Sequence, residues 1–171
     1  TVFTPAHNRA DLLGRCFESM KRQTRKDFIW MIIDDGSRDN TREVVESWLR
    51  EPLDFELRYY YKENGGLHTA YNEAIARIDT ELCVCIDSDD FMPDDAVEKI
   101  LAFWEKYGSD EYAGIVGLDF YLDGKVIGDV TIIRHNQEDN KTYSHSTVET
   151  GDEIFVQFLA PVTEESAKAG I

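Results

Sequence analysis

The 171-residue sequence predicts an α/β fold with a mostly parallel sheet flanked by helices and a hairpin near the C-terminus. Three observations predict it. Short apolar runs alternate with amphipathic stretches, which is typical of strand–helix–strand units. Two apolar runs, 28–33 and 82–86, are unbroken, as expected of strands covered on both faces. The pair Asp123-Gly124 is a hairpin signal between the apolar segments 113–122 and 126–133.

The first half of the chain predicts three strands and two helices. A strand ends at Val2-Phe3, and Asp11 is placed to cap the helix after it. The apolar residues of that helix follow helical spacing at Leu13, Cys16, Phe17 and Met20. After the strand at 28–33, Thr41 is placed to cap a second helix, whose inward side chains would be Val44, Val45, Trp48 and Leu49. Residues 57–61 form the third predicted strand.

The second half continues the same alternation. The third helix has an apolar stripe of Leu67, Ala70, Tyr71, Ala74, Ile75 and Ile78. A fourth buried strand at 82–86 precedes a helix that starts at Pro93, with Val97, Ile100, Leu101 and Trp104 inward. The fifth strand, 113–122, leads into the hairpin.

The charge is strongly negative and unevenly distributed. Lys and Arg total 18 against 34 Asp and Glu, a net charge of −16, and residues 79–171 hold 21 of the acidic side chains. Such a surface repels phosphate backbones, so nucleic-acid binding is not expected. A small anionic ligand would need the more basic first half of the chain, or a divalent cation held by carboxylates.

Cysteines and apolar runs indicate the compartment. Cys16, Cys83 and Cys85 are an odd number without zinc-ligand spacing, so we expect buried free thiols in a reducing compartment. No apolar run approaches the ~18 residues of a membrane span, and the start does not resemble a signal peptide. Since Thr1 opens inside a predicted strand, we expect a few residues to precede it.

Polar segments follow each of the first four predicted strands, where parallel sheets bind ligands. They are residues 4–9, 34–37, 62–66 and 87–90. In the last of them, Asp87 and Asp89 are placed to share a hard cation such as Mg²⁺ or Mn²⁺. The alternative is an acidic turn that caps the helix after Pro93.

The other three segments have two interpretations each. A carboxylate of Asp34-Asp35-Gly36-Ser37 could accept a hydrogen bond from a nucleobase, or the segment could be only a turn. Asn64-Gly65-Gly66 could let an anion approach a helix N-terminus, or form a plain loop. His7 could stack on a base, or be a solvated or capping histidine.

Taken in order, the segments resemble family-2 glycosyltransferases of the GT-A fold. The resemblance is carried by Thr-Pro-Ala-His-Asn-Arg, Ser-Met-Lys-Arg-Gln-Thr, Ile-Asp-Asp-Gly-Ser-Arg-Asp-Asn-Thr, Asn-Gly-Gly with Ala-Tyr-Asn, and Asp-Ser-Asp-Asp, a DXD motif, within about residues 1–107. It implies a GT-A-like nucleotide-diphospho-sugar transferase fold, a nucleotide-diphosphate-sugar donor (usually a UDP-sugar), a divalent metal and an inverting transfer. The acceptor would be a saccharide or a lipid-linked molecule, as in surface polysaccharide synthesis.

Carried over by position, the resemblance implies the site residues. Asp34 or Asp35 would bind the uracil, and Asp87 and Asp89 would hold Mg²⁺ or Mn²⁺. The family often has Tyr where this chain has His7, which leaves the stacking role open. The nucleotide-sugar-binding residues would be Pro5, Ala6, His7, Arg9, Asp34, Asp35, Lys62, Asn64, Gly65, Gly66, Asp87 and Ser88.

The general base of the family lies downstream, and Asp152 and Glu153, after Gly151, are the best candidates here, of which we choose Asp152. Glu164-Glu165 is a poorer candidate. Residues 1–107 would form the nucleotide-sugar-binding half, and 108–171 the hairpin and a partial acceptor-side segment of the same domain. We expect a cytoplasmic protein, with peripheral association at the inner face of a membrane as an option. The alternatives are a non-catalytic nucleotide-sugar-binding domain and a nucleotidyltransferase, although Thr4–Arg9 lacks the glycines of a phosphate loop.

Overall fold

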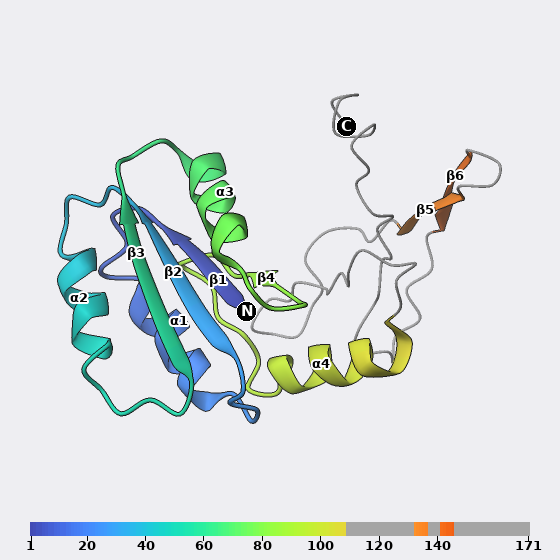
Figure 1. Cartoon of the computed structure of the whole chain (residues 1–171), viewed down its shortest axis with the longest axis horizontal. Coiled ribbons are helices and arrows are strands. Elements are labelled where there is room, and N and C mark those ends of the chain that lie inside the picture. The colour runs from blue at the N-terminus through green and yellow to red at the C-terminus, as the bar shows by residue number, and fades with distance from the viewer. Residues whose placement is uncertain (109–131, 137–140, 146–171) are drawn as a thin grey trace. The chain divides into compact units, whose positions relative to one another are not determined.

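The computed structural model describes residues 1–108, 132–136 and 141–145, in two compact units, Thr1–Leu101 and Ala102–Ile171. The first unit contains the predicted alternation of strands and helices (Figure 1). Its strands are β1 (Val2–Ala6), β2 (Ile29–Asp35), β3 (Glu56–Lys62) and β4 (Val84–Cys85). The helices are α1 (Leu13–Arg22), α2 (Thr41–Trp48), α3 (Leu67–Arg77) and α4 (Ala96–Tyr107), the last of which continues into the second unit.

The four strands form one parallel sheet in the order β3-β2-β1-β4. In register, Val2 of β1 lies opposite Trp30 of β2 on one side and Val84 of β4 on the other. The chain therefore steps outward from β1 to β3 and then returns to the far side of β1. This reversal of strand order lies between β1 and β4, and in α/β sheets ligands bind at the carboxyl ends of the strands at such a point.

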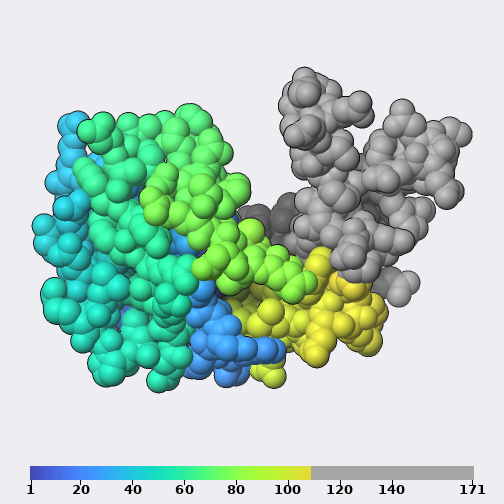
Figure 2. Space-filling view, viewed as in Figure 1, coloured from blue at the N-terminus to red at the C-terminus, as the bar shows by residue number. Residues whose placement is uncertain are grey.

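Helices cover both faces of the sheet, and strand alternation decides which side chains meet them. Val2, Ala6, Trp30 and Ile32 pack with α1, α2 and the start of α4. Phe3, Met31 and Ile33 pack on the other face with Ala70 and Ala74 of α3. Residues of β3 and α3, coloured green, form much of the surface of this unit on the side seen in Figure 2.

The α1 side of the core is built on aromatic side chains. Phe17 of α1 stacks on Trp48 of α2 with ring centroids 4.2 Å apart, and both lie about 6 Å from the ring of Trp30. The Trp30 indole N–H donates to Thr4 Oγ1 at 3.0 Å, so this buried polar atom is satisfied.

The helix starts differ from the sequence predictions. Asp11 does not cap α1, because a turn in which Leu12 and Leu13 N–H donate to the Arg9 carbonyl leads directly into the helix. Thr41 does not cap α2 either. The N-cap residue is Asn40, whose side chain makes no capping bond, and Asp39 Oδ1 accepts instead from the Thr41 backbone N–H at 3.0 Å and from its hydroxyl at 2.6 Å.

Some predicted burial is also wrong. Leu49 at the end of α2 is 45% exposed, and Leu67 and Ile75 of α3 are 61% and 60% exposed. The reason in α3 is that it packs on the sheet through the small side chains Ala70 and Ala74, which leaves the flanks of its apolar stripe in solvent.

The fourth strand is shorter and less buried than predicted. β4 holds two residues and lies at one edge of the four-stranded sheet in the described part of the chain. Accordingly Cys83 is exposed and Cys85 half-buried, and the prediction of a buried thiol is confirmed only for Cys16.

The second unit contains an antiparallel pair, β5 (Ile132–Asn136) and β6 (Lys141–His145), with Arg134 opposite Tyr143. The predicted turn Asp123-Gly124 and the predicted strand 113–122 lie outside the described residues. Among the helices that are described, none is both long and apolar enough to cross a membrane. The predicted division of the domain after residue 107 stays a prediction.

Candidate functional site

The loops after β1 and β2 are hydrogen-bonded to one another at the carboxyl edge of the sheet. Asn8 has a φ of 54°, a left-handed conformation that asparagine tolerates. Its backbone N–H donates to Ser37 Oγ at 2.8 Å, and its Oδ1 accepts from the Arg38 N–H at 2.8 Å. Arg9 N–H donates to the buried Thr41 Oγ1 at 2.9 Å. These contacts hold the first two candidate segments as one rigid rim.

The two adjacent aspartates at the end of β2 point to opposite faces of the sheet, as strand alternation requires. Asp34 is fully buried on the α1 and α2 side. Its Oδ1 accepts from the Ser37 N–H at 2.8 Å and its Oδ2 from the Tyr59 hydroxyl at 2.6 Å. Burial and this carboxylate raise the pKa of Tyr59, so the phenol stays protonated and donates.

Asp35 is directed to the α3 side, where it joins β2 to the start of that helix. Lys62 Nζ donates to its Oδ1, as does Gly65 N–H at 3.0 Å, while Gly66 N–H donates to its Oδ2 at 2.8 Å. Burial acts to raise the pKa of Asp35, but Lys62 and the two backbone donors outweigh burial and lower it. Asp35 thereby satisfies N–H groups at the N-terminus of α3 that have no partner within the helix.

His7 lies on the rim of this cluster with its side chain exposed. Its Nδ1 is 2.8 Å from the carbonyl oxygen of Asp35, and its Nε2 is 3.1 Å from the Asn8 side-chain nitrogen. Nδ1 also lies 3.2 Å from the side-chain nitrogen of Asn64. When Nδ1 donates to the Asp35 carbonyl and Nε2 accepts from Asn8, the Asn64 amide donates to that same carbonyl at 2.9 Å and not to the ring. The ring is thus oriented by its two nitrogens. Pro5 and Ala6, by contrast, are the last residues of β1 and are buried.

Gly36 provides a stability test of this corner. Its φ is +73°, and a Cβ placed on it would lie 2.5 Å from the backbone nitrogen of Asn64. We expect Gly36→Ala to cost about 1–3 kcal/mol and to displace the Asn64–Gly66 loop. Urea unfolding measures the loss. Gly14→Ala is the matched control, because its added Cβ meets nothing within 4 Å; equal stability of the two variants would contradict the prediction.

The acidic turn after β4 is attached to β1 and to its loop. Ile86 N–H donates to the Phe3 carbonyl at 3.0 Å, and Asp90 N–H to the Asp87 carbonyl at 3.0 Å, which closes the turn. Ser88 is buried and accepts from Arg9 Nε at 3.2 Å. Asp87 and Asp89 flank it and are exposed.

This donor set fits a hard divalent cation. Mg²⁺ is usually bound by one or two carboxylates, with water and substrate phosphates completing its shell. Within the described ranges, no three or more His, Cys, Asp or Glu side chains gather closely enough to hold a metal ion. Asp87 and Asp89 are nonetheless two exposed carboxylates on one turn, which is the number of protein ligands that a cation also bound to water and substrate phosphates uses.

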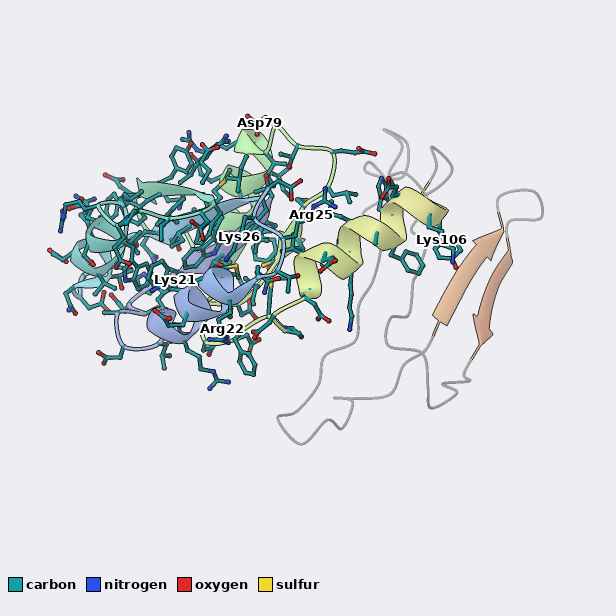
Figure 3. The ribbon with its side chains drawn as sticks, turned by 90° about the horizontal axis from the view of Figure 1, so that it is seen from below. Lys21, Arg22, Arg25, Lys26, Asp79 and Lys106 are labelled. Carbon is teal, nitrogen blue, oxygen red and sulfur yellow. The ribbon has the colours of Figure 1, made fainter. Side chains whose placement is uncertain are left out.

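A cavity of about 220 Å³ lies elsewhere, lined by Lys21, Lys26 and residues 51–55. Both lysines belong to the end of α1 and the segment after it (Figure 3). Since β2 starts at Ile29 and β3 at Glu56, the cavity lies at the amino edge of the sheet. The cavity is therefore separate from Asp34 and Asp35 after β2 and from Asp87 and Asp89 after β4.

The structure brings together the residues predicted in the first three loops and at the acidic turn. Asp152 lies outside the described residues. Sequence reasoning placed Ser37 in the second segment but did not predict that it holds Asp34, and it missed Tyr59, which also donates to Asp34, and Thr69, whose hydroxyl donates to Asp35 Oδ1 at 3.4 Å. Ser37 holds Asp34 through its backbone N–H, so the usable signal was Asp34 itself, because aspartate side chains often accept from the backbone of the turn that follows them. Tyr59 and Thr69 carried none.

Comparisons with known proteins agree on one family. The family model described as "Glycosyl transferase family 2" matches residues 1–152. Glycosyltransferase GlyA of Streptococcus pneumoniae serotype 4 is 29% identical over 67% of this chain and 16% of its own length. Chondroitin synthase of Pasteurella multocida is 36% identical over 59% of this chain and 10% of its own. The chain thus spans a minor part of the curated relatives it matches.

Solved structures support the fold. TarS of S. aureus, residues 1–349 in complex with UDP-GlcNAc, superposes with a TM-score of 0.64 at 22% identity, covering 76% of this chain and 38% of that one. Mannosyltransferase PcManGT of Pyrobaculum calidifontis, in complex with GDP-Man and Mn2+, superposes with a TM-score of 0.59 at 24% identity, covering 70% and 35%. The α/β fold is that of the GT-A glycosyltransferases.

Proposed function

The chain belongs to glycosyl transferase family 2, and from that premise we propose that it transfers a sugar from a nucleotide-diphosphate donor to an acceptor. The observation that carries the proposal is the joining of two loops at the strand reversal. Arg9, from the loop after β1, donates to Ser88, between the exposed Asp87 and Asp89 after β4. Cationic and acidic groups thus meet where such a sheet binds nucleotides.

The donor we propose is a UDP-sugar. TarS of S. aureus has been solved with UDP and with UDP-GlcNAc, which supports a uridine nucleotide. The exposed ring of His7 would stack on the base, and the buried Asp34 or Asp35 would hold the uracil edge. Asn64, Gly65 and Gly66 would approach the nucleotide from the start of α3, with Lys62 and Arg9 supplying positive charge. Pro5 and Ala6 would border the uridine through their backbone.

The cation we propose is Mg²⁺ or Mn²⁺, held by Asp87 and Asp89. When bound, it would neutralise the diphosphate and act as a Lewis acid as the sugar leaves. Asp89, the second carboxylate of the DXD motif, is exposed on a turn that its neighbours Asp87 and Asp90 close. A cation held in this way would allow a chain of net charge −16 to bind the anionic diphosphate.

The transfer we propose inverts the configuration of the sugar. It then needs a base on the side of the sugar opposite to the leaving diphosphate. Asp152 remains our candidate for it. We propose a saccharide or lipid-linked acceptor, in keeping with relatives named chondroitin synthase and hyaluronan synthase. The three free cysteines support a cytoplasmic location, and a lipid-linked acceptor would bring the protein to the inner face of the membrane.

Ligand-dependent stabilisation tests the proposal on the intact chain. We expect UDP with Mn²⁺ to raise the Tm, since a ligand at about 100 times its Kd adds about 2.7 kcal/mol of stability. UDP with EDTA, and GDP with Mn²⁺, are the matched comparisons. A subsequent assay of UDP release from UDP-sugars separates an enzyme from a binding domain. No stabilisation by any nucleotide with Mn²⁺ would refute the proposed site.

A further inference from the structure

The last turn of α1 and its C-cap residue, Gln23, carry two buried polar side chains that meet the segment after the acidic turn. Ser19 and Gln23 are four residues apart, so they lie one above the other on the helix surface. Ser19 is fully buried and Gln23 is 1% exposed. Neither takes part in the candidate site. Burying a glutamine is costly unless its donors and acceptor are satisfied, so its partners indicate what it does.

Those partners are backbone groups of residues 92–97. Ser19 Oγ accepts from the Met92 N–H at 3.2 Å. Gln23 Nε2 donates to the Pro93 carbonyl at 2.7 Å and also to the Ser19 carbonyl of α1 at 3.2 Å, and its Oε1 accepts from the Val97 N–H at 3.0 Å. Val97 is the second residue of α4 and lies 74 residues after Gln23, so Gln23 caps a helix that is distant in the sequence. This explains why α4 begins at Ala96, after a turn that includes Pro93, and not at Pro93.

Further contacts fasten the same segment to the end of α1. Thr24 N–H donates to the Asp94 carbonyl at 2.7 Å, and Thr24 Oγ1 to Glu98 at 2.7 Å. Arg22, labelled in Figure 3, pairs with Asp94 at 2.9 Å. The last two contacts are exposed and therefore contribute little energy. The buried bonds of Ser19 and Gln23 are the ones that fix the segment.

The segment begins immediately after the proposed metal ligands. Only two residues separate Asp89 from Met92. On its other side the acidic turn is held by Ile86, bonded to β1, and by Ser88, bonded to Arg9. Residues 90–95 contain no strand or helix in the structure, so α1 supplies the second anchor. Without it, the turn would be fixed at one end only.

We propose that Gln23, supported by Ser19, is a positioning residue that sets the place of Asp87 and Asp89 for cation binding. The inference rests on the proposed function, and it adds a part of α1 that lies outside the candidate site. Groups that orient metal ligands without contacting the metal themselves typically contribute about 10- to 100-fold in metal affinity or activity. A hydrophobic side chain of similar size at position 23 would fill the space but leave three backbone groups without partners.

The test compares Gln23→Leu with Val45→Ala in the full chain. Val45 is a fully buried residue of α2, so its truncation lowers stability without touching the segment. Two readouts are taken: the Mn²⁺ concentration that half-saturates UDP binding, and hydrogen exchange of the Asp90 and Met92 amides. We expect Gln23→Leu to raise the Mn²⁺ requirement by about tenfold or more and to speed exchange at both amides. Val45→Ala should change neither beyond its effect on global stability.

Each outcome decides the matter. Wild-type Mn²⁺ dependence and control-like exchange in Gln23→Leu would overturn the inference. If the wild-type chain fails to bind UDP with Mn²⁺, the proposed function fails, and the exchange data still show whether Gln23 orders the turn. Should Gln23→Leu not fold, Ser19→Ala replaces it, since the only bonds it removes are the one that Ser19 Oγ accepts from Met92 N–H and the one it donates to the Cys16 carbonyl within α1. Gln23→Glu, which keeps the acceptor for Val97 but loses both donated bonds, should give an intermediate effect.

Discussion

Replacing Asp89 by alanine is expected to abolish Mn²⁺-dependent UDP binding and to lower sugar transfer by at least about 100-fold. The reason is that Asp89 is exposed on a closed turn, so the side chain contributes charge to the ligand and little to packing. The fold should be unaffected, and the free energy of unfolding without ligand should stay within about 0.5 kcal/mol of the wild-type value. Calorimetry with UDP at fixed Mn²⁺ measures the binding, and release of UDP measures transfer.

Asp54→Ala is the charge-matched control for this experiment. It removes one exposed carboxylate at the amino edge of the sheet, so general electrostatic effects of a less negative surface appear in it equally. Asp87→Ala should resemble Asp89→Ala. Unchanged Mn²⁺ dependence in both aspartate variants would show that the acidic turn holds no catalytic cation.

Replacing Asp35 by alanine should produce the largest loss of stability, about 3 kcal/mol. The variant leaves Lys62, whose side chain is 20% exposed, without its anion, and leaves the Gly65 and Gly66 N–H groups without their acceptor. Urea unfolding measures the loss. In a double-mutant cycle, adding Lys62→Met to Asp35→Ala should cost little more, because the unpaired ammonium is gone. Additive costs would show that the two side chains are not coupled.

The same interaction gives stability a defined pH dependence. The pKa of Asp35 is lower in the folded chain: burial opposes ionisation, but Lys62 and the backbone donors outweigh it. Its contribution is complete above the unfolded pKa of about 3.9 and is lost as the pH falls through the lower folded value. The stability difference between wild type and Asp35→Asn should therefore shrink on acidification below about pH 4. A difference that grows in acid would contradict this assignment.

Much of the fold followed from the sequence because local patterns determine it. The unbroken run at 28–33 and the alternation of segments predicted the buried β2 and the parallel sheet, and the polar strand ends predicted the edge that carries the candidate site. Burial of α3 was misjudged, since the small contact made by Ala70 and Ala74 depends on the distance between helix and sheet. The short β4 likewise depends on what pairs with it, which periodicity does not report.

The partners of the site residues could not be predicted, because they are distant in sequence. That Asp35 joins Lys62 to the start of α3, and that Gln23 caps α4, follows from the three-dimensional packing alone. The sequence indicated the chemistry of each loop. It did not indicate which carboxylates are used inside the protein and which project into solvent.

Because Asp34 and Asp35 point to opposite faces of the sheet, the length of β2 before them cannot change by a single residue without turning both side chains to the wrong face. One carboxylate serves the layer of α1 and α2, and its neighbour serves the layer of α3. Inserting or deleting a single residue upstream within the strand would exchange the two environments, sending each acid away from its donors and each apolar neighbour to the wrong layer. Length changes that preserve the protein should therefore occur in pairs within this strand, or be confined to the connections on either side of it.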